Sequence, residues 1–171
     1  MSRKEILTTY DRGVTKVVRR AGPRDLPLLP RIEERCDRLF GEVGIVFPPG
    51  PTVVEEAIRD GEEILVAGDP PVGFAAVIEL DGHWHLEQIA VHPDHGRRGI
   101  GTALLDAARA GRDGITLITF REVPWNGPWY ARHGFTELPE AEWGPELRAH
   151  WRAEIDAGLH RLGPRLIMAA P

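Results

Sequence analysis

The chain has little of several features that mark common protein classes. It contains a single cysteine, Cys36, so no disulfide can form within it, which suits a reducing compartment. Lys and Arg total 21 against 26 Asp and Glu, a net charge of −5, whereas nucleic-acid binding needs a basic face. No run approaches the roughly 18 apolar residues that cross a bilayer, and the first ten residues lack the apolar segment of a secretory signal. We therefore expect a cytoplasmic protein without a nucleic-acid or membrane partner.

What is present fits one compact domain. The 171 residues are 42% hydrophobic and 27% charged, which is enough apolar material for a core and argues against general disorder. We see no internal repeat and no low-complexity linker. The division expected from sequence is a loose leader over residues 1–13 and a single domain over residues 14–171.

Local patterns predict an alternation of strands and helices. Strands are expected at 14–20, 63–67, 72–80, 83–91, 115–120, 135–138 and 165–169, and helices at 25–40, 53–60, 99–110, 126–133 and 145–157. Asp25 is a candidate cap for the first helix, whose start should be irregular because Pro30 does not suit a helix interior. Thr52 and Glu55 form a capping-box pattern. The helices should pack around a mixed sheet of largely sequence-adjacent strands, with the middle two joined by a helical crossover.

The most informative segment is a glycine-rich turn between a strand and a helix, running from Gly96 to Thr102. The first N–H groups of a helix have no internal partner and the helix dipole is positive there, so such a turn can bind a pyrophosphate through main-chain amides. The turn lacks the third glycine of a dinucleotide fingerprint, since Leu104 stands there, and it lacks a Walker lysine. The plainer alternative is that these glycines only make a tight turn.

The strand over residues 83–91 changes its alternation. Apolar Trp84 and Leu86 occupy even positions, whereas Ile89 and Val91 occupy odd ones. Because alternate side chains of a strand share a face, this slip predicts a β-bulge near Glu87. A bulge can leave N–H groups free to stabilise a developing negative charge, although a simple bend would produce the same slip.

Two motifs resemble those of the GNAT superfamily of acetyl-CoA-dependent N-acetyltransferases. Residues 91–105 are similar to its coenzyme signature, Q/R-x-x-G-x-G/A after a strand, with Gly96 in place of the Gln or Arg. Residues 130–135 match a second element, Tyr-x-x-x-Gly-Phe. The resemblance implies an α+β (mixed α/β) fold: a mostly antiparallel central sheet of about seven strands, splayed at the strand that binds acetyl-CoA and flanked by helices.

The resemblance also implies site residues for transfer of an acetyl group from acetyl-CoA, as co-substrate, to a primary amine. The expected coenzyme contacts are Ile89, Ala90, Val91, Gly96, Arg97, Arg98, Gly99, Ile100, Gly101, Thr102, Asn126 and Tyr130, with the backbone near Val91 as the oxyanion site. An amine of pKa near ~10 must lose a proton before it attacks a thioester. Glu87, directly or through water, is the first candidate base and His85 the second; the alternative is that both are solvated residues of the sheet face.

Other candidate roles remain open. Tyr130 is the expected acid for the leaving thiolate, or else a core tyrosine. Asn126 contacts the pantetheine amides or caps the short helix that follows. Cys36 lacks a neighbouring histidine or basic cluster, so direct attack by the amine is favoured over an acetyl-enzyme. Four histidines, at positions 83, 85, 92 and 95, show no convergence of ligands, so no metal is expected.

The specificity elements and partners are less defined. The loop over residues 41–51, with Trp125 and Trp129, lines the acceptor pocket or simply covers the core. The acceptor is a small-molecule or peptide amine, and a homodimer is possible by analogy with the family. Two other functions compete: a non-catalytic acyl-CoA-binding sensor or regulatory module, and a nucleotide-binding regulator that uses the glycine-rich turn.

Overall fold

The computed structural model describes residues 7–11 and 14–171 of the chain. Its strands form one sheet in the order β1-β2-β3-β4-β5-β6-β8-β7. Their bounds are β1 Leu7–Asp11, β2 Val14–Arg20, β3 Glu63–Ala67, β4 Gly73–Leu80, β5 His83–Val91, β6 Ile115–Phe120, β7 Thr136–Glu137 and β8 Arg165–Ala170. Neighbouring strands are antiparallel except β5 and β6, which are parallel. The mixed, mostly antiparallel fold expected from the sequence is confirmed.

The first strand adds to the predicted set. Residues Leu7–Asp11, inside the segment expected to be a loose leader, form β1 and pair with β2 at the edge of the sheet. The other leader positions, 1–6 and 12–13, lie outside the described residues. The described sheet therefore contains eight strands, one more than the seven or so that the resemblance implied.

Five α-helices accompany the sheet within the described residues: α1 Leu29–Asp37, α2 Val53–Asp60, α3 Ile100–Arg109, α4 Gly127–Arg132 and α5 Pro145–Asp156. The irregular start expected near Pro30 is present, because 3-10 turns precede and follow α1. The capping box at Thr52 is confirmed. The cap expected at Asp25 is wrong, since its carboxylate instead accepts hydrogen bonds from Arg19 and from the Gly22 amide. Among the described helices, none has the length and apolarity needed to cross a membrane.

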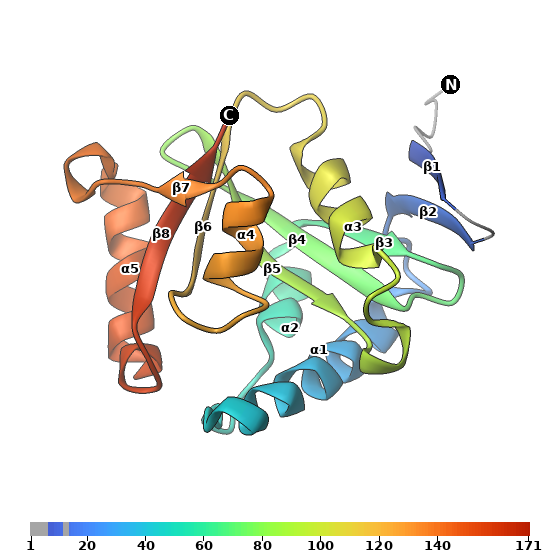
Figure 1. The fold of residues 1–171 in the computed structure, drawn as a ribbon, viewed down its shortest axis with the longest axis horizontal. Coiled ribbons are helices and arrows are strands. Elements are labelled where there is room, and N and C mark those ends of the chain that lie inside the picture. The colour runs from blue at the N-terminus through green and yellow to red at the C-terminus, as the bar shows by residue number, and fades with distance from the viewer. Residues whose placement is uncertain (1–6, 12–13) are drawn as a thin grey trace.

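The helices cover the two faces of the sheet in different groups. On one face, α3 and the Tyr130 ring of α4 pack against Leu86, Leu117 and Met168 in the larger core cluster. On the other face, α1 and α2 pack against inward residues of β3 and β4, including Phe74. Figure 1 shows β1 and β2 (blue) at one end of the molecule and α5 with β7 and β8 (red) at the other. His85, which alternates with Leu86 along β5, therefore faces away from α3.

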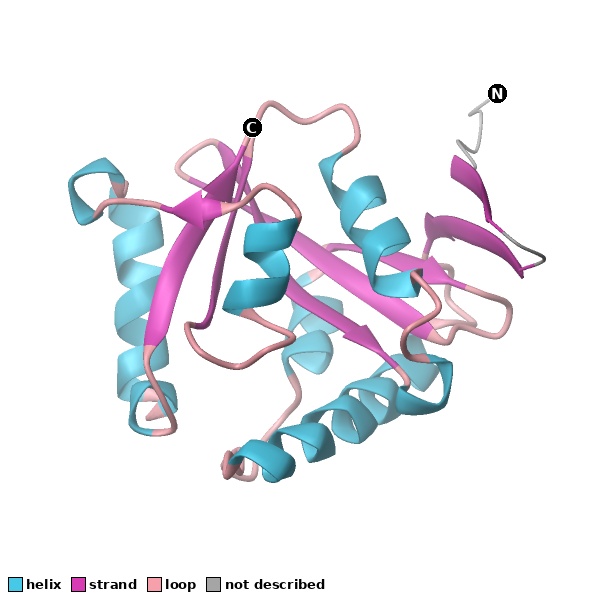
Figure 2. Ribbon diagram, in the orientation of Figure 1, coloured by secondary structure: helices cyan, strands magenta, loops and turns pink. Residues whose placement is uncertain are grey.

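The sheet opens between its two parallel strands. Pairing of β5 with β6 stops at Leu86 opposite Leu117, and beyond that point the strands diverge, with α4 in front of the opening (Figure 2). The register between β4 and β5 also shifts there, because Ala76 pairs with Gln88 and Val77 pairs with Leu86. Glu87 is thus the extra residue of a bulge, as the change in alternation predicted. The bulge and the splay coincide on one strand.

The helix α5 is anchored to the rest of the molecule by Asp81, in the turn between β4 and β5. The Asp81 carboxylate accepts hydrogen bonds from the Glu146 and Leu147 amides at 2.9 and 3.0 Å, and the Asp81 amide donates to the Glu146 carboxylate. This is a capping box whose two halves are far apart in the chain. It fixes the start of α5 against the β4–β5 hairpin.

We expect Asp81→Gly to lower the free energy of unfolding by about 1–2 kcal/mol, because the first amides of α5 lose their acceptor. Asp81 has φ +55°, a conformation that glycine adopts without strain, so the change introduces no backbone strain. Urea unfolding is the measurement. Asp81→Asn should lose less, since asparagine tolerates this φ and keeps one of the two acceptor oxygens that receive the Glu146 and Leu147 amides. Equal losses in the two variants would contradict the role of the cap.

Candidate active site

The bulge brings Glu87 against a residue of α5. Glu87 Oε2 lies 2.8 Å from Nε2 of His150 and 3.8 Å from Nε2 of His85. The Glu87 and His150 side chains are 20% and 26% exposed, whereas His85 is 1% exposed. The two predicted base candidates therefore lie together, but only Glu87 keeps a partly open carboxylate. The structure adds His150 as a third member.

His85 is held inside the protein. Its Nδ1 lies 2.8 Å from the Thr116 hydroxyl on β6. Burial lowers the pKa of His85 to about 4, against the opposing attraction of Glu87. A fully buried imidazole with this pKa is neutral at pH 7 and is a poor proton acceptor. The geometry thus favours Glu87 over His85, in the order that the sequence suggested.

Glu87 of β5 and His150 of α5 form an ion pair beside the opening in the sheet. Burial raises the pKa of Glu87, but the close contact with His150 and the charge of its ring outweigh it, and the net shift is downward. The same partner raises the pKa of His150 above its ordinary value. Sequence reasoning missed His150, although its spacing of three residues from Leu147 places it on the apolar side of the predicted helix. The spacing does not reveal which strand α5 packs against, so the contact with Glu87 could not be predicted.

The amides expected to form the oxyanion site have different environments. The Ile89 N–H donates to its neighbour Gln88 at 3.0 Å. The His92 amide donates to the carbonyl of Val72, the residue just before β4. Because amides alternate in direction along a strand, the Ala90 amide also points toward β4 and away from the opening. The Val91 amide faces the opening. There it lowers the pKa of the Cys36 thiol of α1, against the larger raising effect of burial. Among the three predicted residues, Ile89 and Val91 therefore present their amides on the open side.

Gln88 is held in place by a buried carboxylate. Glu33 of α1 is 2% exposed and accepts hydrogen bonds from the Gln88 side chain and from the Val53 and Val54 amides at 2.8–3.0 Å. Burial is the main cause of the raised pKa of Glu33. The carboxylate joins the start of α2 to the bulged strand, and thereby orients the side chain that covers the Ile89 amide.

The glycine-rich turn at the end of β5 presents a run of free amides. The Gly96 amide donates to Pro93 within the turn, so it is unavailable to a ligand. Among the described residues, no protein acceptor receives a hydrogen bond from the amides of residues 97–102, and the first i→i−4 bond of α3 begins at Ala103. Arg97 and Gly99 both have positive φ, +57° and +72°, which turns successive amides toward one concave surface. This arrangement suits an anion such as a pyrophosphate.

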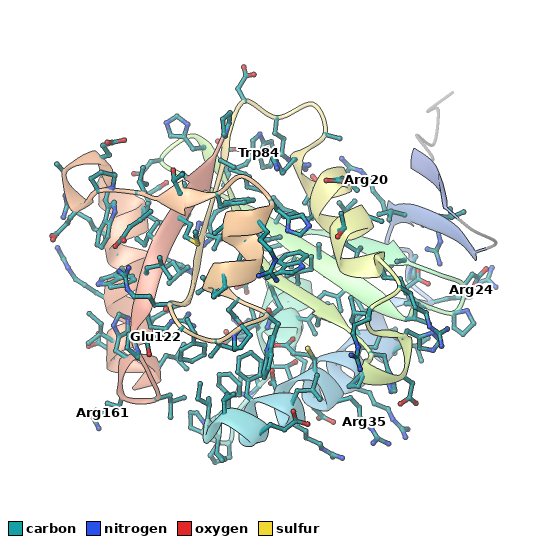
Figure 3. The ribbon with its side chains drawn as sticks, in the orientation of Figure 1. Arg20, Arg24, Arg35, Trp84, Glu122 and Arg161 are labelled. Carbon is teal, nitrogen blue, oxygen red and sulfur yellow. The ribbon has the colours of Figure 1, made fainter. Side chains whose placement is uncertain are left out.

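We expect Arg97→Gly to raise the dissociation constant of CoA about 10-fold, because a charge-assisted contact to phosphate is lost. Glycine accepts the positive φ at this position, so the fold should be retained. Isothermal titration at low and high salt is the measurement, and the difference should shrink as salt rises. Arg161→Gly is the control, since Figure 3 labels that side chain at the end of the molecule near α5 and β8. Unchanged CoA affinity in Arg97→Gly would exclude this contact.

The short helix α4 places Tyr130 beside the opening. Its start lies so close to β6 that a Cβ on Gly127 would come within 2.6 Å of the Arg121 carbonyl. Tyr130 is 7% exposed, and burial raises the pKa of its hydroxyl above the ordinary value, with the nearby Cys36 thiol also raising it. The hydroxyl therefore stays protonated across the physiological range.

Asn126 stands at the N-cap position of α4 but its side chain makes no capping bond. Its Nδ2 donates to the Thr119 hydroxyl at 2.7 Å, while its buried Oδ1 has no partner among the described residues. The side-chain cap that was one reading of Asn126 is therefore wrong. The other reading, a contact with pantetheine, is compatible with the free acceptor atom.

The aromatic residues near the expected acceptor pocket divide into two groups. Phe40, Phe47 and Phe120 form a core cluster, with Trp125 packed edge-on against Phe40 and 36% exposed. Trp129 instead packs beside Gly101 of the glycine-rich turn. A groove of about 470 Å³ lies elsewhere, between β7, β8 and α5, lined in part by Trp143 and Trp151, and none of the predicted site residues lines it.

A sheet splayed beside a bulged strand, with free helix-terminal amides at the end of that strand, defines the class of GNAT-type folds. Comparison with known families agrees: residues 60–137 match the family model described as an acetyltransferase (GNAT) domain. This segment contains the bulge, the glycine-rich turn and Tyr130. The resemblance to the GNAT superfamily read from the two motifs is confirmed over residues 60–137 of the chain.

Individual relatives point the same way. The chain is 35% identical over 109 residues to a mycothiol acetyltransferase of Parafrankia, covering 60% of this chain and 32% of that protein. A mycothiol acetyltransferase of Nocardiopsis dassonvillei is 31% identical over 133 residues, covering 58% and 37%. The chain thus spans about a third of the length of these curated relatives.

Solved structures share the fold. A GNAT-family acetyltransferase of Staphylococcus aureus superposes with a TM-score of 0.63 at 16% identity, covering 90% of this chain and 96% of that one. N-acetylglutamate synthase of Neisseria gonorrhoeae, solved with coenzyme A and N-acetyl-glutamate, gives 0.62 at 21% identity, covering 98% and 35%. At these identities the likeness concerns the architecture.

Proposed function

We propose that the protein transfers an acetyl group from acetyl-CoA to a primary amine. The observation that carries this proposal is the run of amides at residues 97–102, which have no acceptor among the described residues and stand at the end of the strand that bears Glu87. A pyrophosphate bound there would direct the pantetheine arm along the opening between β5 and β6. Such a path ends near Glu87 and Tyr130.

The amine would lose its proton to the Glu87–His150 pair. Both side chains are partly open, and their polar atoms are 2.8 Å apart. The carboxylate holds the imidazole and raises its pKa, so a neutral His150 can accept a proton that Glu87 then stabilises by charge. Glu87 acting alone or through water is the simpler form of the same step, and His85 is too deeply buried for either role.

The thioester would be activated from the other side of the opening. Its carbonyl oxygen accepts a hydrogen bond from the Val91 amide or, once the Gln88 side chain moves aside, from Ile89, which stabilises the negative charge that develops. After the tetrahedral intermediate collapses, Tyr130 donates its proton to the departing thiolate. A buried phenol that remains protonated at neutral pH suits a thiol of pKa near ~8.5.

We expect Cys36→Ser to retain acetyl-transfer activity within about 2-fold of the parent, because a thiol that is not a nucleophile is not needed for the chemical step. Burial raises the pKa of the Cys36 thiol to about 11, so very little thiolate exists at pH 7 to attack a thioester. Steady-state kinetics should show intersecting rather than parallel lines, and intact mass spectrometry after mixing with acetyl-CoA should show no protein acetylation at Cys36. An inactive Cys36→Ser variant, together with acetylation of Cys36 in the parent protein, would establish a covalent route instead.

The direct test of the proposal is transfer of radiolabelled acetyl from acetyl-CoA to a panel of amines. The panel spans amino acids, polyamines, aminoglycosides, peptide N-termini and the acceptor of the mycothiol acetyltransferases. Thermal-shift screening with acetyl-CoA present selects the acceptors to assay first. Transfer to one amine class supports the proposal. Binding of acetyl-CoA without transfer to any of them would select the acyl-CoA sensor, and tighter binding of NAD or ATP than of CoA would select the nucleotide-binding regulator.

The proposed reaction also suggests where the protein acts. The proposed reaction needs acetyl-CoA from the cytoplasm, and a single free thiol suits the same reducing compartment. We therefore place the protein in the cytoplasm. Cell fractionation with an antibody to the chain tests this placement. Recovery in a membrane or secreted fraction would contradict it.

A further inference from the structure

The residues proposed to take the proton also form a compact set of metal-ligand atoms. One ligand atom from each of His85, Glu87 and His150 lies within 4.8 Å of the other two. Two of the three residues come from β5 and the third from α5, which Asp81 anchors to the same hairpin. The cluster therefore sits on regular, fixed elements.

The atoms around this cluster favour a cation. Glu87 Oε2 is buried and lies 2.8 Å from the His150 ring nitrogen, yet no partner among the described residues makes a well-aligned hydrogen bond to it. The Nδ1 of His85 is engaged by the Thr116 hydroxyl at 2.8 Å, which leaves Nε2 on the side of Glu87. Ligating histidines usually have their other nitrogen held by a hydrogen bond in this manner.

The spacing is close to that of a tetrahedral zinc site. Bonds of about 2.0–2.2 Å to nitrogen and oxygen place neighbouring ligand atoms roughly 3.4 Å apart. The pairs measured from Glu87 Oε2, at 2.8 and 3.8 Å, fall on either side of that value. Small side-chain rotations would equalise them. Two histidines and one carboxylate with an open fourth position are a ligand set that zinc accepts.

We propose that His85, Glu87 and His150 bind a divalent transition-metal ion, with zinc as the best fit, and that the bound ion blocks acetyl transfer reversibly. The binding depends only on these three side chains, whereas the block rests on the proposed function, because the ion occupies the lone pairs that would take the proton of the amine. The site revises the expectation of no metal, which weighed only the histidines at positions 83, 85, 92 and 95. His150, far along the chain, supplies the convergence that those four lack.

The test begins with the full chain freed of metal by EDTA and dialysis. Titration with Co²⁺ should produce visible d–d absorption of tetrahedral strength at one equivalent, and Zn²⁺ should displace it. We expect His150→Gln and Glu87→Gln each to weaken Zn²⁺ binding by at least about 100-fold, and Thr116→Val to weaken it by about 10-fold through loss of the hydrogen bond to His85. Circular dichroism checks that each variant is folded.

His160→Gln is the matched control. His160 lies 3.9 Å from Glu154, which makes a second His–Glu pair with no third ligand among the described residues, so its loss should leave Zn²⁺ binding unchanged. Absence of a stoichiometric Co²⁺ spectrum, or equal Zn²⁺ affinity in the parent and in His150→Gln, would overturn the site.

Binding is measured without acetyl-CoA, so a protein that binds Zn²⁺ but acetylates no amine retains this site and loses the proposed function. In an active protein, saturating Zn²⁺ should lower turnover at least 10-fold and EDTA should restore it; full activity with Zn²⁺ bound would refute the block.

Discussion

Glu87→Gln should lower kcat for acetyl transfer at pH 7 by roughly 10²–10³-fold, the range expected when a positioned proton acceptor is removed. The amide keeps the size of the side chain but cannot accept a proton or hold a positive His150. The loss should be partly recovered as pH rises toward the pKa of the amine, because more of the acceptor then arrives already neutral. A pH–rate profile with EDTA present, measured for both proteins, is the observation needed.

The shape of the parent profile follows from the same pair. Glu87 raises the pKa of His150, and a protonated imidazole cannot accept a proton. Activity should therefore be low below this raised pKa and increase as pH rises through it. Glu79→Gln, an exposed carboxylate on β4, is the control and should follow the parent. A Glu87→Gln profile of the same height and shape as the parent would remove Glu87 as the base.

Tyr130→Phe should lower kcat by about 10²-fold with little change in the KM for acetyl-CoA, because the phenol is needed when the thiolate leaves and not when the coenzyme binds. The ring remains to pack against Trp129 and Phe135, so the melting temperature should stay near that of the parent. Steady-state kinetics with both substrates varied, together with thermal unfolding, separates the two effects.

A packing variant distinguishes the hydroxyl from the ring. Phe135 is 2% exposed and contacts Tyr130, so Phe135→Leu should cost stability while leaving the hydroxyl in place. We expect it to lower the melting temperature more than Tyr130→Phe does and to lower kcat less. The reverse order would mean that Tyr130 is a core residue without a part in proton transfer.

Much of the fold is readable from local sequence because its determinants are local. The strands β3, β5 and β6 begin and end at the predicted residues, since each follows a turn that contains glycine, at Gly61, Gly82 or Gly114. The bulge at Glu87 could be predicted because apolar residues alternate along a strand, and an extra residue in the backbone register shifts that alternation by one position. Asp25 shows the limit of such reasoning: a capping residue beside a helix start was used for an ion pair with Arg19 instead, and the arginine belongs to a neighbouring strand.

The candidate site divides in the same way. The sequence by itself determined the glycine-rich turn, the bulged strand and the Tyr130 motif, because backbone conformation and alternation are set by residues next to one another. Only the tertiary structure decided that His150 meets Glu87, that Glu33 of α1 holds Gln88, and that Asp81 caps α5 through the amide of Leu147, 66 positions further along. Contacts of this kind depend on how α1 and α5 dock on the sheet, and that docking is settled by packing over the whole domain, which no short segment encodes.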